Sequence, residues 1–373
     1  MIVTQLLVSS LSVYLLALLA LRLFGSFRSF VFTFFGYFLV PIVSYYDVIA
    51  LSESFSTSAL ILSLYFLFTT RDRRQIALSG ACLTWCVFLR PVFLPVVALC
   101  SLYILVNARR AGYRRALSCA IVFLSMLILA ESVWVVGRYK NGATSDFAIP
   151  STLPPNYLDE AKHSQALIGF LKAIGEDWQR SVAPDVNCIV ETSRFGCWDL
   201  ENLRRRALLA QSDVLTFNPD TPRAEALALN RTINDELEAY TRSVRMEHPV
   251  YYYIIAPAKN LIRLFAASST YSMFGKYGTM SRSWLPFRLG IDGMAWVLQL
   301  SFAAAVLWGW SRSAEKGKLA LVAGIIAYFY FVHALLFRMS DFRYVVPVLP
   351  LLVMVTVSFG SGLLGREDVA KTT

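Results

Sequence analysis

Three arginines stand at tight turns between apolar runs, a position typical of side chains with a function. Arg90 precedes Pro91 in a turn between two apolar runs, and Arg338 and Arg343 lie in a short charged turn between two others. The guanidinium group presents a planar fork of donors that matches phosphate oxygens. We therefore expect the three side chains to face one shared polar cavity, although each could instead anchor its segment at a membrane surface.

Acidic side chains near these turns are candidates for acid–base chemistry. Asp47 and Glu53 flank a short loop, and the two carboxylates could form an acidic wall of an outward-facing site. Equally, Ser52 could cap a helix whose first turn contains Glu53, which would make both acids ordinary interfacial charges. An ionisable residue inside an apolar run, such as Glu131, usually has a function. The side chains expected to complete the wall of the cavity are Glu131, Arg138, His333, Asp341 and Tyr344.

The composition places these residues in a membrane protein. Of the 373 residues, 56% are hydrophobic and only 16% are charged, with a mean hydropathy of +0.53, whereas soluble proteins carry about 25% charged residues. A membrane-spanning helix needs about 20 predominantly apolar residues. We expect an all-α polytopic membrane protein with about nine spans, at residues 5–24, 29–47, 54–70, 75–89, 92–108, 116–136, 290–310, 319–336 and 344–364.

Basic residues predict the orientation of these spans. Loops on the cytosolic side carry an excess of Lys and Arg, and alternate loops of this chain are rich in both. The bias leaves Arg90, Arg338 and Arg343 on the outer side, and it accounts for the net charge of +10 without nucleic-acid binding. The residues assigned to the cytosolic side are Arg22, Arg28, Arg71, Arg73, Arg74, Arg109, Arg110, Arg114, Arg115, Arg312, Lys316, Lys318, Arg366 and Lys371.

This orientation divides the chain into three regions. We expect an N-terminal transmembrane module at 1–136, a mostly helical external insert at 137–289 and a C-terminal transmembrane module at 290–373. Within the insert, residues 250–266 are apolar with two cations on one face, typical of a helix lying in the membrane interface. The protein is expected in the plasma (inner) membrane, with the insert outside. A second insert helix is predicted by three- and four-residue spacing of Ala226, Leu229, Ile233, Leu237, Tyr240 and Val244.

The cysteines predict one disulfide and no metal centre. Cys188 and Cys197 lie in the external insert, where an oxidising compartment favours a bond between them. The other four cysteines lie inside spans and are expected to pack in the core. No motif for a nucleotide or a metal ion occurs, so no cofactor is identified, and a requirement for a divalent metal is left open.

The order of several motifs resembles one family of membrane enzymes. The chain is similar to GT-C glycosyltransferases, in the bacterial branch related to protein O-mannosyltransferases and the lipid A aminoarabinose transferase. The resemblance covers most of the membrane part and little of residues 143–245. Its motifs are Gln5–Tyr14, Leu23–Gly25, Ala50–Ser54, Gly80–Pro91, Trp134–Gly142, His248–Pro249, and Arg343-Tyr344 followed by Pro347 and Pro350.

The resemblance implies sugar transfer from a polyprenyl-phosphate carrier to a lipid, glycan or protein acceptor on the outer face. The carrier phosphate would be held by arginine, with Arg90, Arg338 and Arg343 as candidates, and the insert would bind the acceptor. The family's usual base lies in a loop between its first two spans, which we expect this chain to lack because its start resembles the second span. Asp47 and Glu53 are then the nearest acidic substitutes.

Two other functions remain open. A non-catalytic relative would bind a lipid-linked sugar or a partner protein without transferring the sugar. A transporter, flippase or ligase of envelope polysaccharide would also handle lipid phosphates with arginines, but such transporters typically show internal repeats and broken helices, and neither is visible in the sequence. Bound membrane lipids are expected in all three cases.

Overall fold

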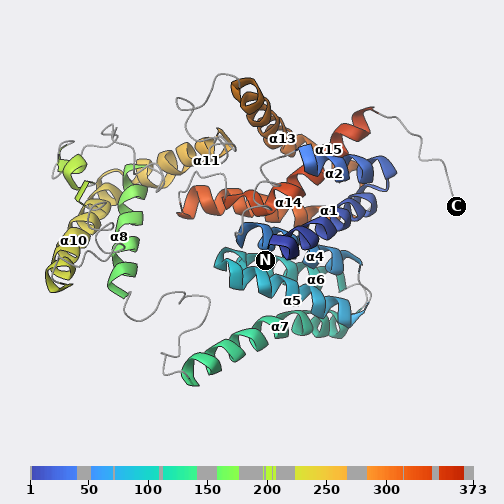
Figure 1. Cartoon of the computed structure of the whole chain (residues 1–373), viewed down its shortest axis with the longest axis horizontal. Helices are drawn as coiled ribbons and strands as arrows, with labels where there is room; N and C mark the ends of the chain where they lie inside the picture. Colours follow the sequence, from blue (N-terminus) through green and yellow to red (C-terminus); the bar gives the residue numbers. More distant parts are fainter. Residues whose placement is uncertain are drawn as a thin grey trace. The chain divides into compact units, whose positions relative to one another are not determined.

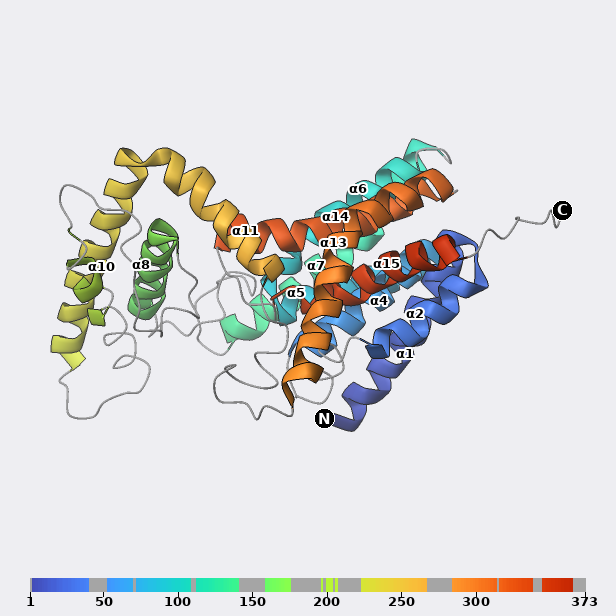
Figure 2. The same cartoon turned by 90° about the horizontal axis from the view of Figure 1, so that it is seen from above.

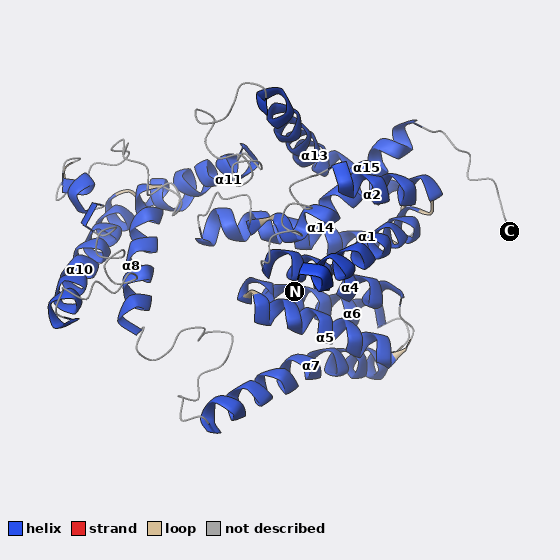
Figure 3. Ribbon diagram, viewed as in Figure 1, coloured by secondary structure: helices blue, strands red, loops and turns tan. Residues whose placement is uncertain are grey.

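The computed structural model describes the helical parts of the chain. The described residues are 2–39, 52–69, 72–108, 112–140, 158–175, 196, 199–203, 205–206, 223–266, 284–313, 315–337 and 344–364. Among them no strand occurs (Figure 3). The prediction of an all-α protein is therefore confirmed for this part of the chain.

A helix lies over each predicted span (Figure 1). Within the described residues, four helices are long and apolar enough to cross a membrane: Val3–Phe24, Tyr113–Val136, Leu285–Ser311 and Lys316–Leu336. Three shorter apolar helices cover Glu53–Thr69, Pro91–Asn107 and Val346–Gly360. In chain order the elements are α1 (Ile2–Phe24), α2 (Phe27–Leu39), α4 (Ser52–Thr69), α5 (Arg73–Leu89), η1 (Pro91–Phe93), α6 (Leu94–Ala108), α7 (Tyr113–Lys140), α13 (Leu285–Arg312), α14 (Lys316–Phe331), η8 (Val332–Phe337), η10 (Val346–Val348) and α15 (Leu349–Leu364).

Several of these helices, α7 and α13 among them, expose large apolar side chains. On α7, Ile128 and Val133 are 64% and 67% exposed, and on α13, Leu300 and Leu307 are 77% and 73% exposed. Such a surface is unfavourable in water but matches the hydrocarbon interior of a bilayer. The chain is an all-α membrane protein, and the count of nine spans stays a prediction.

The contacts divide the chain into two compact units. Unit 1 comprises 1–150, 268–329 and 345–373, and unit 2 comprises 151–267 and 330–344. The division therefore assigns the segment around His333 to the same unit as most of the predicted insert. The predicted three-region organisation rests on membrane topology and stays a prediction.

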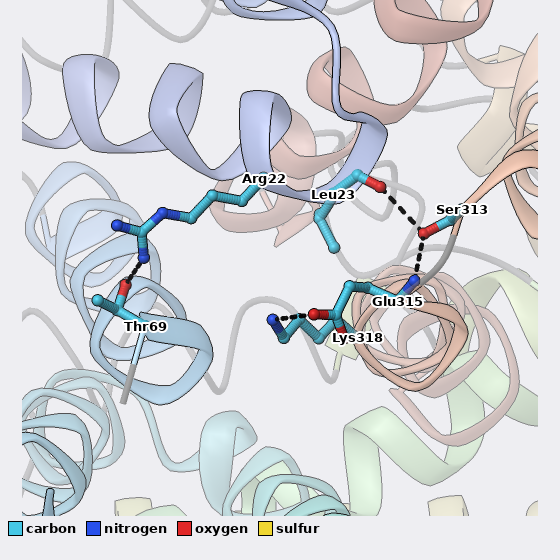
Figure 4. Close-up of polar contacts among 6 residues, drawn as sticks. All are labelled: Arg22, Leu23, Thr69, Ser313, Glu315 and Lys318. Atoms are coloured by element: carbon cyan, nitrogen blue, oxygen red, sulfur yellow. Dashed lines mark hydrogen bonds and ion pairs between the residues drawn. The ribbon is translucent and has the colours of Figure 1, made fainter. Parts of the chain in front are cut away.

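Hydrogen bonds join several predicted cytosolic segments at one end of unit 1, which we call the basic end. Arg22, in the last turn of α1, donates to Thr69 at the end of α4. Ser313, after α13, donates its hydroxyl to the Leu23 carbonyl at 3.0 Å. The basic end is defined by Arg22, Leu23, Thr69, Ser313, Glu315 and Lys318 (Figure 4).

The helices of unit 1 pack through small and hydroxyl side chains. Ser12 of α1 donates to Ser58 of α4 at 3.3 Å, and α1 and α4 run parallel because their C-terminal ends meet at Arg22 and Thr69. The α2–α15 pair approaches closely at Gly36, and Figure 2 shows α1, α2 and α15 in one group. Small residues allow such approach where lipid gives helices no hydrophobic drive to associate.

Unit 2 has its own apolar core. It contains α8 (Leu158–Ile174), α10 (Arg223–Glu247), the π-helical turn η5 (Tyr251–Ile255), α11 (Ala256–Ala266) and the π-helical η8. The predicted insert helix is confirmed as α10, and a break before Pro249 ends it. Its described apolar stripe is buried against α8, with Ile233, Leu237, Tyr240 and Val244 at most 1% exposed.

The predicted interfacial helix corresponds to η5 and α11. Its two cations are used inside unit 2, since Lys259 lies over the Tyr251 ring at 5.6 Å and Arg263 donates to the Gly175 carbonyl at 2.8 Å. Gly175 has a φ of +73°, a conformation that favours glycine at the end of a helix such as α8. These contacts fix α11 to the end of α8.

Helices α5 and α7 approach each other closely at Gly80. A Cβ atom on Gly80 would lie 2.5 Å from the Phe123 carbonyl oxygen, so Gly80→Ala should force the helices apart and lower the free energy of unfolding by about 1–3 kcal/mol. Gly324 of α14 has no atom within 4 Å of such a Cβ, so Gly324→Ala should be neutral or stabilising by up to about 1 kcal/mol. Thermal unfolding in detergent, followed by tryptophan fluorescence, measures both, and equal midpoints would contradict the close α5–α7 approach.

Candidate functional site

Two of the sequence-predicted site residues form a buried ion pair. Arg90 Nη2 lies 3.3 Å from Glu53 Oε1, with 14% and 8% of the two side chains exposed. Glu53 lies in the first turn of α4, and Arg90 caps the C-terminal end of α5. An acid at a helix N-terminus and a base at a C-terminus are both stabilised by the backbone dipoles. The ion pair therefore lies where the N-terminal end of α4 meets the C-terminal end of α5.

The backbone at Arg90 follows from the proline after it. A residue before proline is biased away from the helical conformation, and Arg90 is extended, with φ −152° and ψ 107°. Its amide still donates to the Cys86 carbonyl at 2.8 Å, which closes the last turn of α5. Pro91 then begins η1, where its missing donor costs nothing. This turn places the Arg90 side chain at the end of the α4–α5 pair.

The register of α4 against α5 brings Glu53 and Arg90 together. Ser63 and Ser79 exchange hydrogen bonds, each hydroxyl donating to the other's carbonyl at 2.9 and 2.8 Å. The Cys86 thiol donates to the Ser56 carbonyl at 3.4 Å. Ser56 lies seven residues before Ser63 on α4, and Cys86 lies seven residues after Ser79 on α5. The ion pair continues the same antiparallel register, because Glu53 lies three residues before Ser56 and Arg90 lies four residues after Cys86. We call these three contacts the α4–α5 ladder.

Neighbouring helices support the turn that carries Arg90. The Tyr328 hydroxyl of α14 donates to the Val92 carbonyl at 2.8 Å. The Phe93 ring, which is fully buried, lies 5.0 Å from the Phe329 ring. The turn is thus held by α14 as well as by its own backbone.

Glu131 lies near the same end of unit 1. It is 8% exposed on α7. Trp134, one turn later, lies edge-on to Phe88 at a ring distance of 6.1 Å, and Phe88 is two residues before Arg90. Glu131 therefore lies on a helix that packs against α5, and its predicted place in the wall of the site stays a prediction.

Unit 2 contains the other described candidates. His333 is 3% exposed on η8, and its ring stacks on Tyr344 at 5.1 Å with an interplanar angle of 20°. A π-helical segment inside a longer helix frequently marks a functional site. His333 and Tyr344 are therefore neighbours in unit 2, and their predicted place in the wall of the site stays a prediction.

The remaining predicted residues are not described. Asp47, Arg338, Asp341, Arg343, Cys188 and Cys197 lie outside the described residues, and Arg138 lies in α7 without a described side chain. The predicted phosphate role of Arg338 and Arg343 and the predicted disulfide stay predictions. Among the described residues, no group of three or more His, Cys, Asp or Glu could hold a metal ion.

Sequence reasoning missed four buried polar residues. Arg288 and Asp292 of α13 are 0% and 2% exposed and lie 3.9 Å apart, and Gln299 follows seven residues later at 4% exposed. Their spacing puts all three on one helical face. Two charged residues at the start of an apolar run are the pattern by which this face could have been predicted from the sequence. Asn260, fully buried on α11, interrupts the apolar stripe formed by Ala256 and Leu264.

Buried amides without partners indicate positions where water or a ligand can bind. Neither Gln299 nor Asn260 has a hydrogen bond to its side-chain amide within the part of the chain that the structure describes. A buried polar group without a partner costs about 1–3 kcal/mol. Water or another polar group at these positions would recover that cost.

The Glu53–Arg90 ion pair should stabilise unit 1 because each charge offsets the desolvation cost of the other. Glu53→Gln keeps the shape but removes the carboxylate charge that faces Arg90, so the free energy of unfolding should fall by about 3–5 kcal/mol. The double variant Glu53→Gln/Arg90→Gln should lose much less than the sum of the single variants. The exposed pair of Glu201 and Arg205, at 3.4 Å, is the control, and Glu201→Gln should cost less than about 1 kcal/mol. Additive single effects at Glu53 and Arg90, measured by thermal unfolding, would show that the pair does not couple.

No family model, no curated protein and no solved structure matches the chain in comparisons with known proteins.

Proposed function

We propose that the chain is an integral membrane glycosyltransferase that moves a sugar from a polyprenyl-phosphate donor to an acceptor on the outer face. The observation that carries the proposal is the buried Glu53–Arg90 pair at the end of the α4–α5 ladder. A phosphate carried by a membrane lipid must be held at the membrane boundary by a fixed cation. Arg90 suits this role because the carboxylate of Glu53 orients the guanidinium group.

The proposed topology places this pair on the outer side. Nine spans, with 137–289 as an external insert in the plasma membrane, put the basic end in the cytosol. Ser313 and Arg22 lie at that end, where α4 finishes. Glu53 lies at the start of α4 and therefore at its opposite end. The contacts of unit 1 are compatible with this orientation.

The transfer breaks one bond at the sugar and forms another. The acceptor oxygen attacks the anomeric carbon while the bond from that carbon to the phosphate oxygen breaks. The polyprenyl phosphate leaves with an added negative charge, which Arg90 would stabilise because the charge develops close to its donors. The acceptor proton passes to a carboxylate. We assign Glu53 to positioning Arg90 rather than to this proton transfer, which leaves Asp47 as the candidate base.

A second candidate function follows from the same pair. Because Glu53 is engaged with Arg90, the described residues near the turn offer a phosphate-binding cation more clearly than a base. A protein that binds the lipid-linked sugar without transferring it would need only that cation. Binding and turnover therefore have to be measured separately.

The test uses the full chain in phospholipid vesicles with a radiolabelled hexosyl polyprenyl phosphate and a membrane extract that supplies lipid, glycan and protein acceptors. We expect label to move from the carrier to an acceptor. Arg90→Lys keeps the charge but loses the planar fork of donors, so the rate of transfer should fall roughly 100-fold. Arg28→Lys, an exposed change at the start of α2, is the matched control and should leave the rate unchanged.

Binding of unlabelled polyprenyl phosphate, measured by native mass spectrometry, separates the two candidates. Binding that depends on Arg90 without any transfer of label would select the non-catalytic function. Absence of both binding and transfer would contradict the proposed function altogether. Thermal unfolding of Arg90→Lys ensures that loss of fold is not mistaken for loss of the site.

A further inference from the structure

A basic cleft lies between the N-terminal ends of α5 and α7, away from the Arg90 turn. It has a volume of about 520 Å³ and is lined by Asp72, Arg73, Arg114, Arg115 and Cys119. Three arginines against one aspartate leave an excess of two positive charges among these residues. The chemistry of the lining therefore favours an anion.

The cleft is the open end of the α5–α7 interface. The interface is closed at Gly80, whose missing side chain admits the Phe123 backbone. Arg115, Cys119 and Phe123 follow one another at four-residue spacing along α7, and Arg73 precedes Gly80 by seven residues along α5. Both arginines thus continue the packed faces of their helices beyond the point where the helices touch. Gly112, with a φ of +106°, precedes α7 and allows the chain to turn there.

The basic cleft continues into an apolar surface. Arg114, Leu117 and Ile121 share one face of α7 by their three- and four-residue spacing. Leu117 and Ile121 are 42% and 57% exposed. On α5, Leu78 and Trp85 are 48% and 57% exposed. A cationic pocket bordered by exposed apolar side chains of membrane helices matches a molecule with a charged head and hydrocarbon chains.

We propose that the cleft binds the phosphate headgroup of an anionic phospholipid, whose acyl chains lie along Leu117 and Ile121 of α7. Arg73 and Arg115 contact the phosphate from the two helices, and Arg114 extends the site towards the bilayer. A soluble anion would use the arginines alone and would gain nothing from the apolar border, which is why the lipid is preferred. The inference does not depend on the proposed sugar transfer, because it uses the opposite end of α5.

The buried thiol of Cys119, 7% exposed and part of the cleft lining, reports occupancy in the unmodified chain. The full chain in neutral detergent is treated with methyl methanethiosulfonate, and peptide mass spectrometry follows the modification of Cys119. Dioleoyl phosphatidylglycerol should slow this modification, while dioleoyl phosphatidylcholine should not. Equal protection by both lipids would overturn the proposal. Equal protection by inorganic phosphate at the same phosphate concentration would assign the cleft to a soluble anion and also overturn it.

A pair of matched variants tests the arginines. Arg73→Gln/Arg114→Gln removes two charges from the cleft. Because each basic residue near an anionic lipid strengthens its binding, the affinity for phosphatidylglycerol should fall roughly 30-fold. Arg28→Gln/Lys316→Gln removes two exposed charges that are absent from the cleft lining. It should change affinity for phosphatidylglycerol less than about threefold. Native mass spectrometry of the folded variants measures both affinities, and an equal loss in the two pairs would show only a general charge effect.

Discussion

Polar contacts across the α4–α5 interface are the constraint on which the Arg90 turn depends. In a lipid environment apolar side chains do not specify how far one helix slides along another, whereas hydrogen bonds between helices do. The exchange between Ser63 and Ser79 sets one register. A slip by one turn would break that exchange and the contact between Cys86 and Ser56, and it would separate Glu53 from Arg90. The buried charges and the hydroxyl contacts therefore stabilise the same arrangement.

The two ends of unit 1 offer different chemistry. At the basic end, Arg22 and Ser313 bond to neighbouring helix ends, and the cleft beside α5 and α7 holds an excess of positive charge. At the other end, the described residues include Arg90, which pairs with the buried Glu53. A cluster of surface arginines suits a lipid headgroup, whereas a largely buried and oriented cation suits the stabilisation of charge during a reaction. This contrast is why two separate anion sites are proposed.

Much of the fold was predictable from apolar runs and from Pro91. The runs predicted a helix at each expected span, and a proline after Arg90 predicted the turn. The partnership of Glu53 with Arg90 was not predictable, because it depends on a register set by serines of ordinary type. The convergence of Arg73 with Arg114 and Arg115 likewise depends on a close helix approach at Gly80. Arg288 and Asp292 were missed because they lie where the predicted external insert meets the predicted span.

The measurement that tests the central claim most directly is photo-crosslinking of the full chain with a polyprenyl phosphate that carries a photoreactive group next to the phosphate. The account predicts that crosslinked peptides contain the Arg90–Pro91 turn or the first turn of α4 and that excess unlabelled carrier prevents the crosslink. Crosslinks confined to the basic end near Lys316 and Lys318, or crosslinks that unlabelled carrier does not reduce, would contradict the account.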